Sequence, residues 1–291
     1  MFGSHLSVAG GLHLALLDAQ RLGMDCVQVF TKNQRQWKTP PLKPDAIDAW
    51  HAALDETGVP PEAVVSHDSY LINLASPDPA TRQKSIDLFI EEIRRCDALA
   101  IPHLVTHPGA HLGTRDDPAD EEAGLDRIVD SLNRVHDALP DSPTVTCLET
   151  TAGQGTTLGH RHEHLAHVID RVEAPERLAV CIDTAHLIAA GHHLDSAAAA
   201  RQTLNALEAA CGKDSIRVAH INDSQAPPAS RKDRHAHLGQ GHIPEDAMAA
   251  ILRRRGFAKI PKILETAKGE APDGREWDAI NLAAMRKLAG K

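Results

Sequence analysis

The sequence has few aromatic residues and no long apolar run. Phe, Trp and Tyr together make up only 3% of the 291 residues. No apolar stretch approaches the roughly 20 residues that cross a bilayer. The segment Met1–Gly11 also lacks the basic-then-apolar pattern of a secretory signal. We therefore expect a cytoplasmic protein with no membrane partner.

Paired cysteines are absent as well. The five cysteines are odd in number, widely spaced and form no CxxC pair. Cys147 and Cys181 fall within apolar, strand-like runs, where a thiol behaves as a small buried hydrophobic group. This pattern excludes a disulfide framework and a cysteine-based zinc site.

The sequence also lacks an excess of positive charge. The formal net charge is −9, whereas general nucleic-acid binders are usually basic. Histidine, in contrast, is abundant, with 19 residues. Compositional drift is the simplest explanation for so many histidines. Their positions along the chain must therefore decide whether any of them bind a ligand.

Short apolar runs alternate with amphipathic stretches along the whole chain. We expect strands at Phe2–His5, Cys26–Thr31, Ala63–His67, His103–His107, Thr146–Glu149, Ala179–Asp183, Arg217–Ile221 and Lys262–Leu264. We expect helices at Leu12–Leu22, Asp45–Thr57, Ala80–Leu99, Glu122–Leu139, Glu163–Val172, Ala197–Ala210, Glu245–Arg254 and Glu276–Leu288. This alternation predicts an α/β fold, either a (β/α)8 TIM barrel or a doubly wound open sheet. The polar residues at the strand ends favour the barrel, formed by residues 1–291 as a single domain.

Six successive strands end in a potential metal ligand. In a (β/α)8 barrel the active site lies at the C-terminal mouth of the strands. The residues that this rule brings to the mouth are His67, His107, Glu149, Asp183, His220 and Glu265. Such side chains suit zinc, manganese or related divalent metals.

Each of these residues taken singly is more simply explained as a partly buried polar group. Six of them converging on one rim would repel one another and be poorly solvated unless cations neutralised them. The set therefore predicts a metal centre at the mouth of the barrel.

Three further residues extend this set. His186 follows Asp183 by three residues, so that it lies within reach of a second metal. Asp233 and His235 alternate along an extended loop and can point the same way, although the surrounding segment 230–237 alone is typical of a solvated charged loop. The resulting nine ligands exceed what one metal needs. With a bridging carboxylate they suit three metals that keep open positions for water and substrate.

The chain resembles the endonuclease IV family of zinc-dependent apurinic/apyrimidinic endonucleases (AP endonuclease family 2). The motifs that carry the resemblance run from end to end: Gly3–Gly11, Phe30–Trp37, His67–Leu74, His107–His111, Glu149–Gly155, Cys181–His186, His220–Asp223, Asp233–His235 and Leu264–Thr266. Thr150 and Gln240 depart from the usual family pattern, which leaves the rate and the metal preference open.

The resemblance implies a site with three zinc ions. His67, His107 and Glu149 would bind the first zinc. Glu149 would bridge to a second zinc, which is completed by Asp183, His220 and Glu265. The remaining residues, His186, Asp233 and His235, would hold the third.

The resemblance also implies a reaction in base excision repair. The enzyme would hydrolyse the phosphodiester bond 5′ to an abasic site in double-stranded DNA, leaving a 3′-hydroxyl and a 5′-deoxyribose phosphate. Glu149 and Glu265 would be the catalytic carboxylates, and Arg35 and Tyr70 would contact DNA in the gap left by the missing base. Trimming of blocked 3′ ends and a monomeric state are further expectations.

The negative net charge does not contradict this function. Three Zn²⁺ ions outweigh the four ligand carboxylates, so that the rim itself becomes positive. The loops expected around this face add basic residues: Lys32, Arg35, Lys38, Arg231, Lys232 and Arg234.

Two other functions remain open at this point. A single-metal sugar isomerase or epimerase of the xylose isomerase-like barrels would use Glu149, Asp183, His220 and Glu265 only. A non-catalytic protein that recognises damaged DNA would not need nine complete ligands.

Overall fold

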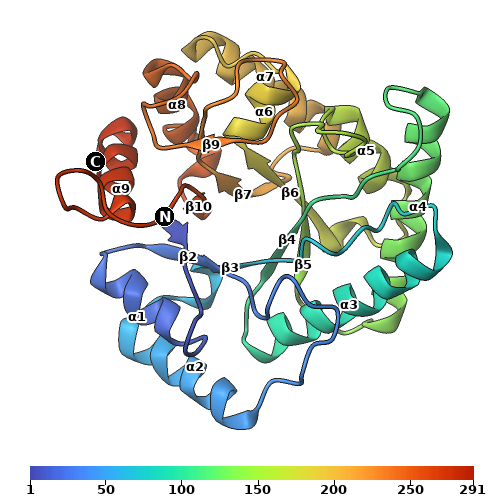
Figure 1. The fold of residues 1–291 in the computed structure, drawn as a ribbon, viewed down its shortest axis with the longest axis horizontal. Coiled ribbons are helices and arrows are strands. Elements are labelled where there is room, and N and C mark those ends of the chain that lie inside the picture. The colour runs from blue at the N-terminus through green and yellow to red at the C-terminus, as the bar shows by residue number, and fades with distance from the viewer.

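Eight parallel strands form a closed barrel in the computed structural model, which describes residues 1–291 (Figure 1). The barrel strands are β1 (Phe2–His5), β2 (Cys26–Val29), β3 (Val64–His67), β4 (His103–Thr106), β5 (Val145–Glu149), β6 (Leu178–Asp183), β7 (Ile216–His220) and β10 (Lys262–Leu264). Each strand pairs with the next barrel strand along the chain, and β10 closes the barrel against β1. The predicted (β/α)8 barrel is confirmed, and the open sheet is wrong.

Helices cover the outside of the barrel (Figure 1). They are α1 (Leu14–Arg21), α2 (Pro44–Thr57), α3 (Pro79–Ala98), α4 (Pro118–Ala138), α5 (His162–Arg171), α6 (Thr184–Ala190), α7 (Ala197–Cys211), α8 (Glu245–Leu252) and α9 (Trp277–Ala289). Single 3-10 turns form at Pro61–Ala63, Pro175–Arg177 and Arg255–Phe257. Eight of the nine helices match the predicted stretches to within a few residues. No helix is both long and apolar enough to cross a membrane.

Helix α6 is the element that the sequence pattern did not predict. It has only seven residues, too few for a periodic pattern to stand out. A cap at each end explains why it forms. The Asp183 carboxylate accepts a hydrogen bond from the His186 backbone N–H at 2.8 Å, and Gly191 ends the helix in the left-handed region with φ of 103°. This cap fixes His186 directly above the end of β6.

The inward alternation of the strands determines which side chains reach the mouth. Six small side chains fill the centre of the barrel in a cluster of their own: Val65, Val105, Cys147, Ala179, Cys181 and Val218. Five of them precede His67, His107, Glu149, Asp183 and His220 by two residues. Because side chains alternate faces along a strand, each of these ligands points inward one layer closer to the mouth. All five cysteines are buried, including Cys147 and Cys181, for which burial was expected.

A short antiparallel pair crosses above the mouth. The strands β8 (Asp223–Ser224) and β9 (His235–Ala236) pair through Ser224 and His235. Asp223 supports this arrangement because its carboxylate accepts backbone hydrogen bonds from Gly239, Gly241 and Ile243 at 2.9–3.1 Å. The loop that carries Asp233 and His235 is therefore held over the ends of the strands.

Strands β1 and β2 pack so closely at Gly3 that a single added methyl group should destabilise the fold. A Cβ added at Gly3 would lie 1.7 Å from the backbone oxygen of Cys26, and side-chain rotation cannot relieve this clash. We expect Gly3→Ala to destabilise the fold by about 3 kcal/mol or more in urea unfolding. Gly256→Ala is the matched control, because a Cβ there meets nothing within 4 Å. Its effect should stay within about 0.5 kcal/mol, and equal effects of the two variants would contradict the strand packing.

Candidate metal centre

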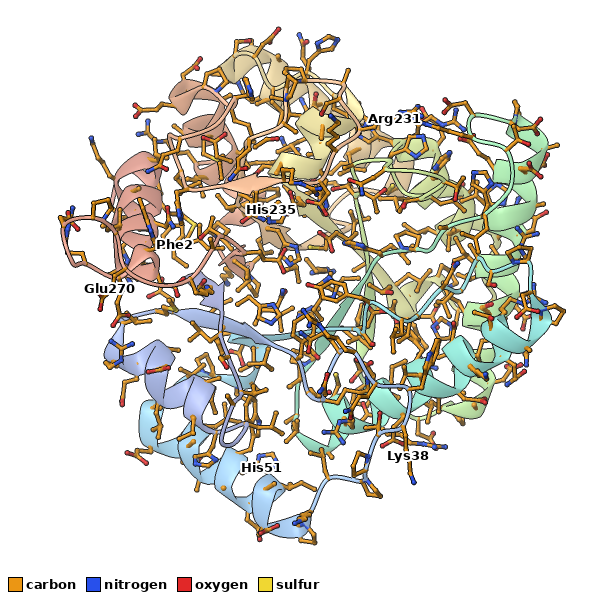
Figure 2. The ribbon with its side chains drawn as sticks, in the orientation of Figure 1. Phe2, Lys38, His51, Arg231, His235 and Glu270 are labelled. Atoms are coloured by element: carbon orange, nitrogen blue, oxygen red, sulfur yellow. The ribbon has the colours of Figure 1, made fainter.

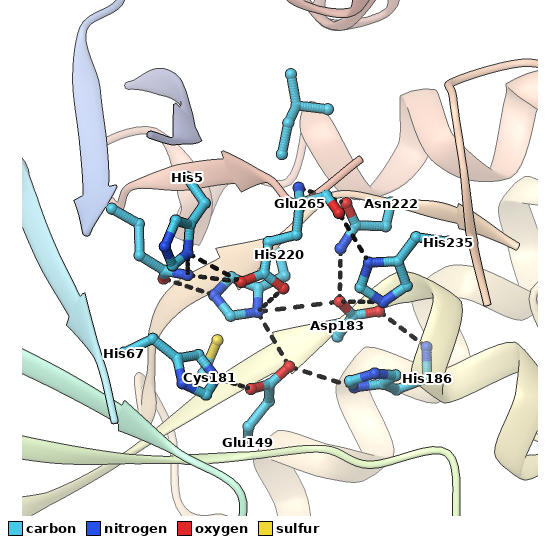
Figure 3. Close-up of polar contacts among 12 residues, drawn as sticks. His5, His67, Glu149, Cys181, Asp183, His186, His220, Asn222, His235 and Glu265 are labelled. Atoms are coloured by element: carbon cyan, nitrogen blue, oxygen red, sulfur yellow. Dashed lines mark hydrogen bonds and ion pairs between the residues drawn. The ribbon is translucent and has the colours of Figure 1, made fainter. Parts of the chain in front are cut away.

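The six predicted strand-end residues lie together at the C-terminal mouth of the barrel (Figure 3). His67, Glu149, Asp183 and His220 are the last residues of their strands, and His107 and Glu265 each follow a strand by one residue. Loop residues join them from above, and Figure 2 shows His235 near the centre of the ring of helices. The structure thus brings all nine predicted residues into one cluster.

Glu149 is the centre of the cluster. Its carboxylate is fully buried, and its Oε2 atom lies 3.2 Å from the Nε2 atoms of both His67 and His107. Its Oε1 atom lies 3.0 Å from His220 Nδ1 and 3.2 Å from His186 Nδ1. One carboxylate shared by several imidazoles has the geometry of a bridging metal ligand.

The donor atoms fall into three overlapping groups. Within each group the atoms lie no more than 4.8 Å apart, and the groups are His67, His107 and Glu149; Glu149, Asp183, His220 and Glu265; and Asp183, His186 and His235. Asp233 joins the last group, because its two oxygens lie 3.2 Å from the Nε2 atoms of His186 and His235. Asp183 therefore touches two groups, whereas the sequence had suggested a place in only one.

Unpartnered nitrogens provide a test of whether cations fit this cluster. His186 Nδ1 faces the Thr150 carbonyl at 2.8 Å and His235 Nδ1 faces the Glu265 carbonyl at 3.2 Å. A carbonyl only accepts, so that Nδ1 carries a proton and the neutral ring offers its lone pair at Nε2. Both Nε2 atoms are buried, and although the Asp233 oxygens lie 3.2 Å away, neither atom makes a hydrogen bond. A backbone carbonyl behind the ring and a free nitrogen in front is the arrangement of a metal-binding histidine.

Without a metal, protons hold the cluster together. Burial opposes protonation of His235, but Asp183 and Asp233 outweigh it and raise its pKa to about 9. Nearby carboxylates likewise raise the pKa values of His67 and His186 in spite of burial. The pKa of His220 is raised by Cys181, Glu265 and Glu149 against the effect of burial. Burial would raise the pKa of Glu149, yet His220 and His107 hold it well below its usual range. So many opposed charges in one buried place are typical of a site that binds dications.

Known proteins share this chain's sequence and fold. Residues 16–288 match the family model of the xylose isomerase-like TIM barrel. A protein of Chloroflexus aurantiacus named "Probable endonuclease 4" is 44% identical over 287 residues, which span 99% of this chain and 97% of that protein. One of the same name from Geobacter sulfurreducens is 42% identical over 98% of this chain and 93% of its own length. The chain belongs to the endonuclease IV family.

Solved structures agree with this assignment to the endonuclease IV family. Endonuclease IV from Thermus thermophilus superposes with a TM-score of 0.84 at 31% identity, covering 99% of this chain and 98% of that one. A D-tagatose 3-epimerase-like protein reaches a TM-score of 0.72 at 16% identity over 99% and 95% of the two chains. At that identity the likeness shows a common barrel and no more.

A cavity of about 220 Å³ opens above the cluster of proposed ligands at the barrel mouth. Its walls include His5, Phe30, Tyr70 and Lys268 together with the proposed ligands of the rim. A larger cavity, of about 690 Å³, lies between α7 and α8 on the outside of the barrel and contains none of these residues. Of the two cavities, only the one at the mouth is lined by the proposed metal ligands.

The two residues predicted to contact DNA differ in position. Tyr70 lines the cavity, leaves 68% of its surface exposed and stands edge-on to Phe30 with ring centres 5.6 Å apart. Arg35 is also exposed, but it lies on the loop after β2 and does not line the cavity. An exposed aromatic residue at the edge of a polar site is suited to stack on a partner.

Some basic residues expected at the mouth are engaged elsewhere. The side chain of Lys32 is buried in an ion pair with Glu92, with Nζ 3.6 Å from Oε1. Arg231 pairs with Asp116, and Lys38 lies at the edge of the molecule (Figure 2). Four of the six remain exposed and form no ion pair: Arg35, Lys38, Lys232 and Arg234. We expected all six to add positive charge around the mouth. Lys32 does not, because its ammonium group turns inward to Glu92 on α3.

A second His and Glu group lies outside the predicted site. Glu121, His160 and His164 are all buried, with donor atoms within 4.8 Å of one another. Here the guanidinium of Arg161 contacts both Glu121 and His164. The Arg161 guanidinium therefore supplies the positive charge for this group, whereas no arginine or lysine does so among the proposed ligands at the mouth.

Proposed function

We propose that this chain is a DNA-repair endonuclease that hydrolyses the phosphodiester bond 5′ to abasic sites with the help of three zinc ions. The products would be a 3′-hydroxyl and a 5′-deoxyribose phosphate, and the same site would trim blocked 3′ ends. The observation that carries the proposal is the convergence of nine ligand residues around Glu149 in a member of the endonuclease IV family.

Each zinc ion has a proposed set of ligands. His67, His107 and Glu149 would hold the first, and Glu149 would also serve the second together with Asp183, His220 and Glu265. His186, Asp233 and His235 would hold the third. The distances of 3.0–3.2 Å between these groups and the unpartnered Nε2 atoms of His186 and His235 support this division. Bound zinc supplies a Lewis acid for the phosphate and lowers the pKa of water.

The side chains of the protein contribute proton transfer and orientation. Glu149 and Glu265 are suited to orient the attacking water and accept its proton, because both carboxylates lie within 3.1 Å of His220 Nδ1 and Glu265 lines the cavity. Thr150 fixes the site from behind, since its hydroxyl accepts the Asp183 backbone N–H and its carbonyl holds His186. Since the carbonyl belongs to the backbone, its contact with His186 does not depend on the side chain at position 150.

DNA recognition depends on the damaged nucleotide leaving the helix. An abasic nucleotide has no base to unpair, so that its extrusion costs less than that of an intact nucleotide. Tyr70 and Arg35 then fill the gap in the duplex, as expected from the exposure of both side chains. We propose that residues 1–291 act as one catalytic domain and as a monomer. One core cluster that runs from Phe2 to Met285 supports the single domain. A DNA substrate favours a cytoplasmic location.

A single experiment tests this function against the alternatives. The zinc-loaded protein is incubated with a duplex that carries one tetrahydrofuran abasic analogue, and with the matched intact duplex. We expect one nick on the 5′ side of the analogue, none in the intact duplex, and no nick after a chelator has removed the metal. Binding without a nick would favour a recognition protein. Epimerisation of a ketohexose without a nick would favour the sugar enzyme.

A further inference from the structure

Gln28 lies among the metal-site residues without being one of them. Its side chain is fully buried near the end of β2, beneath the cavity. Its amide contacts three groups at once: Nε2 lies 2.6 Å from Glu265 Oε1 and 3.0 Å from His5 Nδ1, and Oε1 lies 2.8 Å from His220 Nε2. Figure 3 shows how closely His5, His220 and Glu265 approach one another at this point. All the hydrogen-bonding capacity of the NH2 group is therefore used.

These contacts allow only one orientation of the amide. Glu265 is one of the proposed metal ligands, and a glutamate binds a metal as its carboxylate. A carboxylate only accepts hydrogen bonds. The Gln28 atom facing it at 2.6 Å must therefore be the NH2 group, and the atom facing His220 must be the carbonyl oxygen.

The orientation of Gln28 fixes the proton on His220. An amide oxygen only accepts, so that His220 must donate from Nε2. The nitrogen left for a metal is Nδ1, which lies 3.0 Å from Glu149 Oε1 and 3.1 Å from Glu265 Oε2. This differs from His67 and His107, whose Nε2 atoms face Glu149.

We propose that Gln28 is a positioning residue that selects Nδ1 as the metal-binding nitrogen of His220 and holds Glu265 so that Oε2 faces the metal. The inference rests on the metal centre under the proposed function. It assigns a role to a residue that neither binds metal nor reaches the cavity.

The same amide orients His5. The second N–H of Gln28 donates to His5 Nδ1 at 3.0 Å, which leaves the proton of the neutral ring on Nε2. His5 lines the cavity. Gln28 thus also gives His5 one N–H group to donate to a phosphate oxygen.

NMR of the cadmium-loaded protein tests the choice of nitrogen directly. The protein is labelled with ¹⁵N-histidine and loaded with ¹¹³Cd²⁺, and the coupling between the two nuclei identifies each ligating nitrogen. For His220 we expect coupling to Nδ1, whereas His67 and His107 should couple through Nε2. Coupling of His220 through Nε2 would overturn the inference. Absence of bound cadmium would overturn the proposed metal centre as well, so that the two failures are distinguishable.

Two variants separate the contacts of Gln28. Gln28→Met keeps the approximate volume but loses all three hydrogen bonds. We expect metal affinity to fall by about 10–100-fold, as is usual when the partner behind a ligand is lost. We also expect His220 to show cadmium coupling to both ring nitrogens in place of Nδ1 alone. Gln28→Glu keeps an acceptor for His220 and should retain Nδ1 coupling, but its charge next to Glu265 should still weaken metal binding.

Ser131→Ala is the control for lost buried hydrogen bonds. The Ser131 hydroxyl on α4 is fully buried, lies 3.0 Å and 2.7 Å from the carbonyls of Leu74 and Arg127, and makes no hydrogen bond to a proposed metal ligand. This variant should lower stability but leave metal affinity and coupling unchanged. Unchanged metal affinity in Gln28→Met, or an equal loss in Ser131→Ala, would refute a specific role of Gln28.

Discussion

Replacement of Glu265 by Gln is expected to abolish most DNA cleavage and to leave DNA binding largely intact. The change removes one negative charge and one metal-facing oxygen, which lies 3.1 Å from His220 Nδ1. Loss of a group behind a ligand already costs about 10–100-fold in activity. Loss of the ligand itself should therefore cost at least about 100-fold. Binding should survive because phosphate contacts dominate affinity for DNA.

Glu270→Gln is the matched control for this variant. Glu270 is an exposed glutamate five residues further along the chain and contacts none of the nine ligands. Single-turnover cleavage and fluorescence anisotropy with an uncleavable abasic duplex measure the two effects separately. Wild-type cleavage by Glu265→Gln would remove this residue from the catalytic site. A parallel loss of binding would show that Glu265 serves mainly to hold DNA.

Zinc binding should depend steeply on pH between about 6.5 and 9. In the metal-free protein Asp183 and Asp233 overcome burial and raise the pKa of His235 to about 9, so that at pH 7 zinc must displace this proton. Each released proton should tighten the apparent zinc affinity by about tenfold per pH unit. Calorimetry at pH 7 in buffers of different ionisation enthalpy should detect release of at least one proton.

The stability of the metal-free protein should change in the opposite direction. A histidine whose pKa is raised by folding stabilises the fold below its ordinary pKa of about 6.5, and this contribution is lost as the pH rises through about 9. Urea unfolding of metal-free protein should therefore show falling stability between pH 7 and pH 10, and zinc should reverse the trend. A zinc affinity independent of pH over this range would show that the cluster does not exchange protons for metal.

Much of the fold followed from the sequence because strand and helix patterns are local. All eight barrel strands end within two residues of their predicted ends, and β10 (Lys262–Leu264) has the predicted bounds. The same alternation placed His67 and Glu149 at the mouth, because each lies two residues beyond a side chain that fills the barrel. The alternation of Asp233 and His235 along the loop above suggested that they extend the group, and the family resemblance implied the same.

Partners that are distant in sequence could not be predicted in the same way. The burial of Lys32 against Glu92 depends on how the β2 loop meets α3. The sharing of Asp183 between two groups depends on the short helix α6. Gln28 did give a signal, since it is a polar residue within an apolar strand, but its partners His220 and Glu265 lie at least 192 residues away along the chain.

Zinc content per chain tests the central claim most directly. The account requires that several dications neutralise and share the carboxylates and imidazoles around Glu149. Elemental analysis of purified, active protein, with concentration from amino-acid analysis, should give three zinc ions per chain. An active protein with one ion per chain, or with none, would contradict the account.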